Sequence, residues 1–193
     1  MKKLILSVAV LSAMCAAAAS SAATVGATGT ITFNGNINAD TCELTSNSAG
    51  TSSTGGNIAV NMGSVSTNTL GTEASPVTSS GSLATPSSQD LNLTLQCQTG
   101  TSVDLKLTRQ VASGKGIGLA PGGAQNVQIM LVDTSTGAPL DFTSGSVKLT
   151  KALTGGYSTF PLKAYYTVVS GKTNADVVVG AANGTVNYEI SYN

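Results

Sequence analysis

The last ten residues of the chain, "GTVNYEISYN" at 184–193, alternate between apolar and polar positions. The apolar residues of this stretch share one parity: Val186, Tyr188, Ile190 and Tyr192. Because successive side chains of a strand point to opposite faces, this period of two predicts a strand with one buried face. No further strand follows it in the sequence, so we expect another segment to cover its free edge and its apolar face.

A second alternating stretch lies near the other end of the chain, in "TVGATGTITFNGNINADTC" at 24–42. Its residues of one parity are Gly29, Ile31, Phe33, Gly35 and Ile37, with threonine and asparagine between them from residue 30 onward. This pattern predicts an extended segment with one apolar face. The pattern alone leaves open whether this segment is simply the first strand of the domain or serves another purpose.

Between these two ends, short apolar runs alternate with clusters of Gly, Ser, Thr and Asn, and no stretch keeps the i, i+3, i+4 spacing of a helix. The predicted strands are 30–37, 58–65, 91–97, 102–109, 127–133, 147–149, 157–170 in two pieces, and 185–192. Short strands in this number predict an all-β, immunoglobulin-like sandwich.

Two longer connections are predicted to be loops, because residues 66–88 are mostly polar and residues 112–124 are rich in glycine. The second connection contains "SGKGIG" at 113–118, which lacks the spacing of a phosphate-binding loop and precedes no helix pattern. We therefore expect a mobile glycine loop there.

The first 23 residues have the composition of a secretory signal peptide: lysines at 2 and 3, an apolar run, and small residues before Thr24. The apolar run is shorter than the roughly 20 residues that a membrane helix needs, and no second candidate span follows. We expect removal of residues 1–23 and no stable membrane insertion of the mature chain. Residues 24–193 then suit one domain, given the usual size of about 100–200 residues.

Cysteine and charge refine this picture. Cys15 leaves with the signal peptide, so Cys42 and Cys97 remain as one pair in an oxidising compartment, and a disulfide between them is predicted. The loop that it closes is long enough for a stabilisation of about 4 kcal/mol. With Lys2 and Lys3 removed, seven of the nine basic residues remain against nine acidic ones, which argues against a nucleic-acid partner.

Catalytic chemistry finds little support in the sequence. The chain has no histidine, the commonest general base and metal ligand. Asp40 and Glu43 flank Cys42, but acids beside a strand end are usually solvated rather than catalytic. The chain has no Trp, three Phe and five Tyr, so it offers few aromatic platforms for a sugar. We predict no enzyme activity and no cofactor or metal site; a secreted enzyme or soluble binding domain is the weaker alternative.

Several segments, taken in order, resemble the chaperone–usher pilins, the subunits of type 1-like and P-like fimbriae. The matching segments are "GTITFNGNINADTC", "VNMGSV", "LNLTLQC", "NVQIMLVDTSTGAPL" and "GYSTFPLKAYY". These pilins also carry a penultimate aromatic residue, alternating apolar residues before it, and a glycine fourteenth from the end, the places of Tyr192 and Gly180 here. The resemblance covers nearly the whole mature chain. Met62 departs from the usual Leu, and the two predicted loops do not align.

This resemblance implies an incomplete sandwich that lacks its last strand and is completed by a donor strand from a neighbouring subunit or a chaperone; chaperone–pilin complementation is a known instance of strand addition. Residues 24–37 would be the donor segment and 38–193 the pilin domain. Ile31, Phe33 and Ile37 would enter the neighbour's groove, and Gly35 would pass its narrowest point. The groove would be lined by the C-terminal strand: Gly180, Val186, Tyr188, Ile190 and Tyr192.

The resemblance also implies partners and a location. The chain would pass through the periplasm with a chaperone, polymerise at an outer-membrane usher, and join copies of itself, minor pilins and a tip adhesin in a surface fimbria. Its low charge and its Gly- and Ala-rich composition favour a major rod subunit. Adaptor and terminator roles stay open. A ligand-binding adhesin fits less well, because tip adhesins of this family generally carry an extra lectin domain.

Overall fold

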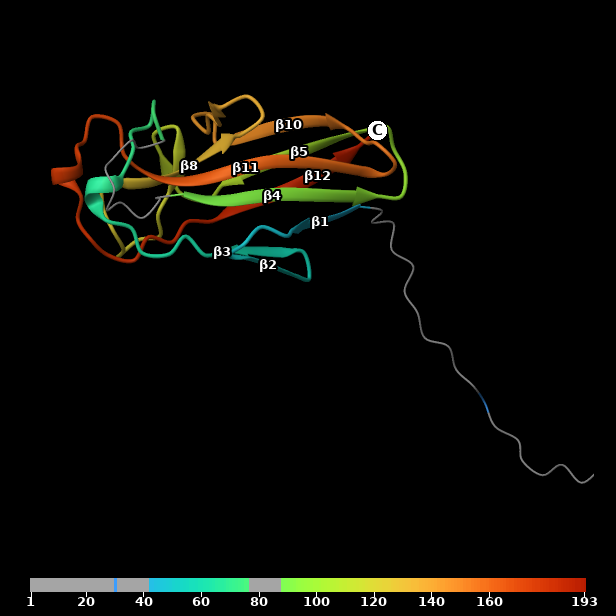
Figure 1. Cartoon of the computed structure of the whole chain (residues 1–193), viewed down its shortest axis with the longest axis horizontal. Coiled ribbons are helices and arrows are strands. Elements are labelled where there is room, and N and C mark those ends of the chain that lie inside the picture. Colours follow the sequence, from blue (N-terminus) through green and yellow to red (C-terminus); the bar gives the residue numbers. More distant parts are fainter. Residues whose placement is uncertain (1–29, 31–41, 77–87) are drawn as a thin grey trace, which may run out of the picture. The chain divides into compact units, whose positions relative to one another are not determined.

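The computed structural model describes residues 30, 42–76 and 88–193, which are coloured in Figure 1. The fold is that of the unit Asn38–Asn193. Its elements are β1 (Cys42–Ser46), β2 (Thr51–Thr54), β3 (Asn57–Val60), the 3₁₀ turn η1 (Thr67–Thr69), β4 (Ser88–Cys97), β5 (Ser102–Arg109), β6 (Ala112–Ser113), β7 (Gly116–Gly118), β8 (Val127–Asp133), β9 (Ala138–Pro139), β10 (Ser146–Ala152), β11 (Tyr157–Val168), the 3₁₀ turn η2 (Asn174–Asp176) and β12 (Val186–Tyr192).

The strands form two main sheets and a small ribbon. The first sheet has the order β1-β4-β11-β8-β7-β6, with β9 paired to β8, and the second has the order β10-β5-β12. The ribbon is the hairpin β2-β3. All paired strands are antiparallel, and Figure 1 shows the long strands β4 and β11 running side by side. The predicted all-β sandwich is confirmed.

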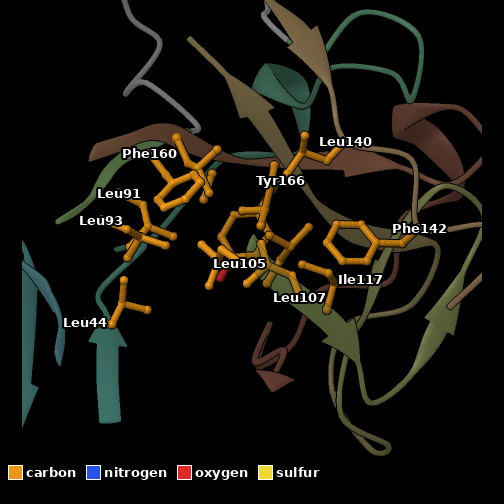
Figure 2. Close-up of a cluster of buried hydrophobic side chains, with 14 of the residues drawn as sticks. Leu44, Leu91, Leu93, Leu105, Leu107, Ile117, Leu140, Phe142, Phe160 and Tyr166 are labelled. Carbon is orange, nitrogen blue, oxygen red and sulfur yellow. The ribbon is translucent and has the colours of Figure 1, made fainter. Parts of the chain in front are cut away.

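Alternation along the strands builds the core between the sheets. In β4 the buried side chains are Leu91, Leu93, Leu95 and Cys97, and in β5 they are Val103, Leu105 and Leu107. Phe160 and Tyr166 of β11 lie among the leucines of both sheets in Figure 2. Because each of these strands presents every second residue to the same face, the sequence pattern was sufficient to predict β4 and β5.

Strand β8 differs because six successive residues, Val127–Val132, are buried. Ile129 and Leu131 face the core, whereas Gln128 and Met130 have the opposite parity and lie on the outer face of the sheet. The Gln128 side chain has 0% of its surface exposed; it donates to Glu73 Oε1 (3.3 Å) and accepts from the Gly116 backbone (3.2 Å). The segment around Glu73 therefore seals the outer face of β8.

The predicted loop at 112–124, with its mobile glycine segment at 113–118, is wrong at both ends of that segment, because Ala112–Ser113 form β6, which pairs with β7. Gly116–Gly118 form β7, a buried strand that pairs with β8. A β-carbon on Gly116 would lie 2.7 Å from Gln128 Oε1 and 2.8 Å from the Ile129 carbonyl oxygen, so only glycine allows this close pairing. The glycines that hid the strand in the sequence are the residues that its packing requires.

Other predicted boundaries shift. The region 157–170 is one continuous strand, β11, not two pieces, and β3 ends at Val60, short of the predicted 65. The structure also adds β1, β2, β6 and β9, which the sequence pattern did not predict, and extends β10 beyond 147–149. Of the predicted first strand at 30–37, all but Thr30 lies outside the described residues.

Candidate functional site

A groove of about 1170 Å³ opens onto the core of the sandwich. We call residues 56–65 its hairpin wall, since they run from the tip of the β2-β3 ribbon, and residues 177–188 its C-terminal wall. Its floor consists of core side chains from both sheets: Leu44, Leu91, Leu93, Leu107, Ile117, Val127, Ile129, Leu131, Ala164 and Tyr166. The groove thus reaches down to the hydrophobic core, whose side chains at its floor are each at most 9% exposed.

The hairpin wall turns a row of apolar side chains toward this floor. Ile58, Val60 and Met62 are half-buried and alternate with exposed residues, as expected for an extended segment. Gly63 has a φ of +66°, a left-handed conformation that glycine adopts without strain. This turn breaks the alternation, so that Val65 is the next residue packed against the core. The segment "VNMGSV" therefore encodes both an apolar row and the bend that redirects it.

The C-terminal wall is fixed to the rest of the domain by backbone hydrogen bonds. The amide of Ala124 donates to the Ala181 carbonyl oxygen (2.8 Å), and the amide of Ala120 donates to the Asn183 carbonyl oxygen (2.7 Å). Gly180 approaches so closely that a β-carbon there would lie 2.9 Å from the Ala124 nitrogen. Any side chain at position 180 would push this wall outward.

Tyr166, at the floor of the groove, is hydrogen-bonded to the C-terminal wall. Its ring is buried in the core, and its hydroxyl donates to the Ala182 carbonyl oxygen at 2.6 Å. Burial raises the pKa of the Tyr166 phenol above the ordinary value of 10.0, because the charged form loses its hydration. The residue lies at the floor of the groove, a role that the sequence analysis missed because only the fold brings Tyr166 next to Ala182.

Strand β12 forms part of the C-terminal wall and leaves one edge open. It pairs with β5 along its whole length, from Val186 opposite Arg109 to Tyr192 opposite Val103. Among the described residues no strand pairs with its other edge. The backbone groups on such an edge are available to another strand.

The structure brings together some of the predicted groove residues but not all of them. Gly180, Val186 and Tyr188 line the groove. Ile190 packs against the core without lining the groove, and Tyr192, at the end of β12, has 39% of its surface exposed. The predicted donor residues, Ile31, Phe33, Gly35 and Ile37, lie outside the described residues.

Charge is missing from the groove lining. None of the lining residues among the described part of the chain is Asp, Glu, Lys or Arg; the polar ones are asparagine, serine, threonine and tyrosine. A desolvated charge would be costly on such a surface, whereas apolar side chains gain about 25 cal/mol for each Å² removed from water. The geometry and chemistry fit an extended, uncharged peptide segment with alternating apolar residues.

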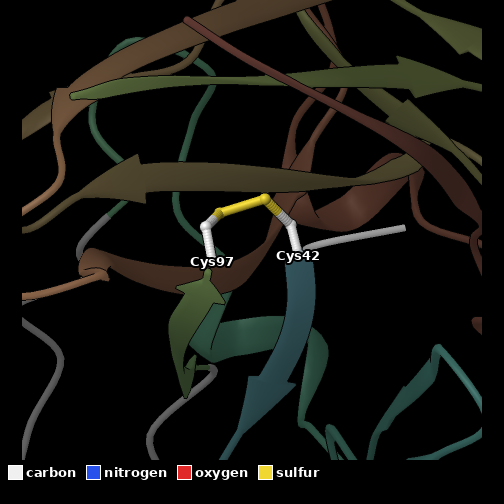
Figure 3. Close-up of a disulfide and its surroundings, with 2 residues drawn as sticks. All are labelled: Cys42 and Cys97. Atoms are coloured by element: carbon white, nitrogen blue, oxygen red, sulfur yellow. A yellow bond between two sulfur atoms is a disulfide. The ribbon is translucent and has the colours of Figure 1, made fainter. Parts of the chain in front are cut away.

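The predicted disulfide is present between Cys42 and Cys97, shown in Figure 3. The two residues are directly paired across β1 and β4, with 4.1 Å between their Cα atoms. The bond holds β1 at the edge of the first sheet and so fixes Leu44, whose side chain contributes to the floor of the groove.

No cluster of His, Cys, Asp or Glu able to hold a metal ion occurs within residues 42–76 and 88–193. Across the same part of the chain, no helix is long and apolar enough to cross a membrane.

The fold and the groove define an all-β sandwich in which an uncharged groove reaches the core beside the edge of β12 that no described strand pairs with. Residues 31–193 match the family described as fimbrial protein, and the chain belongs to that family. The P pilus rod subunit PapA is similar in fold, with 20% identity, a TM-score of 0.50, and coverage of 74% of this chain and 97% of PapA.

Two more of the solved structures that match are a fimbria protein and a tip adhesin. An antigen and type I fimbria protein from Burkholderia pseudomallei has 24% identity and a TM-score of 0.47, with coverage of 79% of this chain and 94% of that protein. The CupB6 tip adhesin from Pseudomonas aeruginosa has 16% identity and a TM-score of 0.47; the similarity covers 56% of this chain but only 30% of that adhesin. No match was found among curated proteins.

Proposed function

We propose that this protein is a structural subunit of an adhesive fimbria and that its groove accepts residues 24–37 of a neighbouring copy. The observation that carries the proposal is the uncharged groove beside the edge of β12 to which no strand in 42–76 or 88–193 is paired. Membership of the fimbrial protein family supports the same conclusion. The subunit therefore polymerises by strand exchange, each copy donating one segment and receiving another.

The proposed donor segment has the chemistry that the groove requires. Ile31, Phe33 and Ile37 share one parity and carry no charge, so one face of the extended segment is apolar. Full burial of such a side chain contributes about 1.5–3 kcal/mol, so the three together contribute about 5–9 kcal/mol before ordering costs are subtracted. Gly35 passes the narrowest point of the groove.

The same features imply a need for assistance before assembly. A free subunit leaves the half-buried apolar side chains of the groove walls and the free edge of β12 without cover, two features that favour aggregation. In our proposal a periplasmic chaperone therefore covers the groove until an outer-membrane usher exchanges it for the next subunit. A rod position, with minor pilins and a tip adhesin elsewhere in the fibre, agrees with the low charge of the chain.

The test compares two versions of the mature chain. One has residues 24–37 deleted, and the other carries them after Asn193 through a short flexible linker. We expect the second version to be monomeric and to melt at least about 10 °C higher, because about 5 kcal/mol of net gain shifts the melting temperature by about 2–4 °C per kcal/mol. Equal melting temperatures would refute the proposal.

A matched control tests the location of the inserted segment. In the version with the appended segment, Gly35→Leu should remove most of the added thermal stability, whereas Asn34→Ser, on the opposite face, should leave it intact. Disulfide formation between Cys42 and Cys97, measured by thiol labelling, should be the same in both variants. Full stability with Gly35→Leu would mean that Gly35 does not pass a narrow point.

A further inference from the structure

One contact joins the two walls of the groove. The hydroxyl of Tyr188, on β12, donates a hydrogen bond to the backbone carbonyl oxygen of Gly56, at the tip of the β2-β3 hairpin. Among the described residues, no other hydrogen bond links the hairpin wall to the C-terminal wall. Tyr188 and Gly56 both line the groove, so this bond spans it.

The two walls differ in how firmly they are held. The C-terminal wall is bonded to β5 through β12 and to the 120–125 segment through its backbone. The β2-β3 hairpin is instead a two-stranded ribbon, closed at its base by its own bond from the Asn61 amide to the Gly50 carbonyl oxygen (2.8 Å). The side chains of Thr51 and Ser53 bond it to Ser46, and Ile58, Val60 and Met62 pack against the core. An isolated two-stranded ribbon is marginally stable in water. The tip of the hairpin, at the exposed Gly55 and Gly56, is therefore the part of the groove whose position depends most on single contacts.

Insertion of a strand requires the walls to stay at a fixed separation. A strand that pairs with the edges of both walls needs them about two strand spacings apart, close to 10 Å. If the hairpin tip were unrestrained, binding would have to order it, and that ordering would weaken the complex. A residue that holds the tip in place before binding reduces this cost.

We propose that Tyr188 is a positioning residue for strand exchange: through Gly56 it holds the hairpin wall at the separation that an inserted strand of a second copy requires. This inference rests on the proposed function, because the occupant of the groove is residues 24–37 of another copy. Tyr188 acts through the hairpin rather than through its apolar surface alone. Its phenol ring packs against the core while its hydroxyl sets the width of the groove.

The test uses the full mature chain with Tyr188→Phe, which keeps the ring and removes only the hydroxyl. The matched control is Tyr192→Phe on the same strand, whose hydroxyl has no hydrogen-bond partner within the described residues. The first measurement is hydrogen exchange of the amides of 51–60. We expect exchange about fivefold faster in Tyr188→Phe, the factor that one ordinary hydrogen bond confers, and no change in Tyr192→Phe. Exchange in β4 and β11 serves as the internal reference for an intact fold.

The second measurement is the dissociation rate of a fluorescent peptide of residues 24–37 from the same proteins. We expect the peptide to leave Tyr188→Phe about fivefold faster than it leaves the wild-type chain or Tyr192→Phe. Unchanged exchange at 51–60, or a tighter peptide complex in Tyr188→Phe, would overturn the role of Tyr188. If the peptide failed to bind the wild-type chain, the proposed function would fall, and the exchange of 51–60 would still show whether Tyr188 holds the hairpin.

Discussion

Replacement of both cysteines by serine, Cys42→Ser with Cys97→Ser, should lower the free energy of unfolding by about 4 kcal/mol. The bond joins residues 55 positions apart, and the loop-closure entropy that it removes from the unfolded chain gives this magnitude. The loss is large compared with the 5–15 kcal/mol that stabilises a typical domain.

The same substitution acts on the groove. Strand β1 is the edge of the first sheet and pairs only with β4 among the described strands of that sheet. Without the covalent bond at Cys42, the pairing from Glu43 to Ser46 alone holds Leu44 in the floor. We therefore expect weaker binding of the peptide of residues 24–37 in addition to lower stability.

The assay is urea unfolding followed by circular dichroism. With a slope of about 2 kcal/mol per M, a loss of 4 kcal/mol moves the midpoint down by about 2 M. The wild-type chain after reduction and thiol blocking is the control, and it should unfold at nearly the same midpoint as the double variant. A shift of less than about 0.5 M would refute the reasoning, because the bond would then constrain the unfolded chain far less than its loop length requires.

Two further substitutions test the buried polar groups. The pKa of Tyr166 is raised in the folded state, so its contribution to stability is complete below about pH 10 and declines as the pH rises further. Tyr166→Phe should remove this alkaline loss of stability. The urea midpoints measured below and above about pH 10 should therefore differ less in the variant than in the wild-type chain. Glu73→Ala should lower the free energy of unfolding in urea by about 1–3 kcal/mol, because the Gln128 amide and the Lys115 backbone N–H lose their acceptor. The control is Glu43→Ala, at an exposed position, which should lower it little. Equal effects of the two substitutions would contradict these hydrogen bonds.

The sequence predicts the elements whose side chains alternate. Strands β4, β5 and β12 carry an apolar residue at every second position, and their predicted ranges agree closely with the structure. Strands β2 and β7 could not be found in this way. Strand β2 is made of Ser and Thr and is exposed beyond Thr51, and β7 contains two glycines, so neither has a side-chain pattern that distinguishes it from a loop.

The residues of the candidate site also fall into those that a local sequence pattern predicts and those that it does not. Gly180, Val186 and Tyr188 were predicted from the last residues of the chain, where the local pattern and the resemblance to pilins both apply. Tyr166 and Gly56 were not predicted, because their roles depend on contacts with residues far away in the sequence. Such contacts follow from sheet order and register, which local periodicity does not determine.

The second sheet has two outer edges of opposite character. At one edge, β10 carries Lys148 and Lys151, and Lys148 lies 3.1 Å from Asp104; at the other edge, β12 has an uncharged groove beside it. Lysines on an edge strand discourage a second sheet from joining there. Association along this sheet is thereby confined to a single side, which favours a linear, unbranched filament over a lateral aggregate.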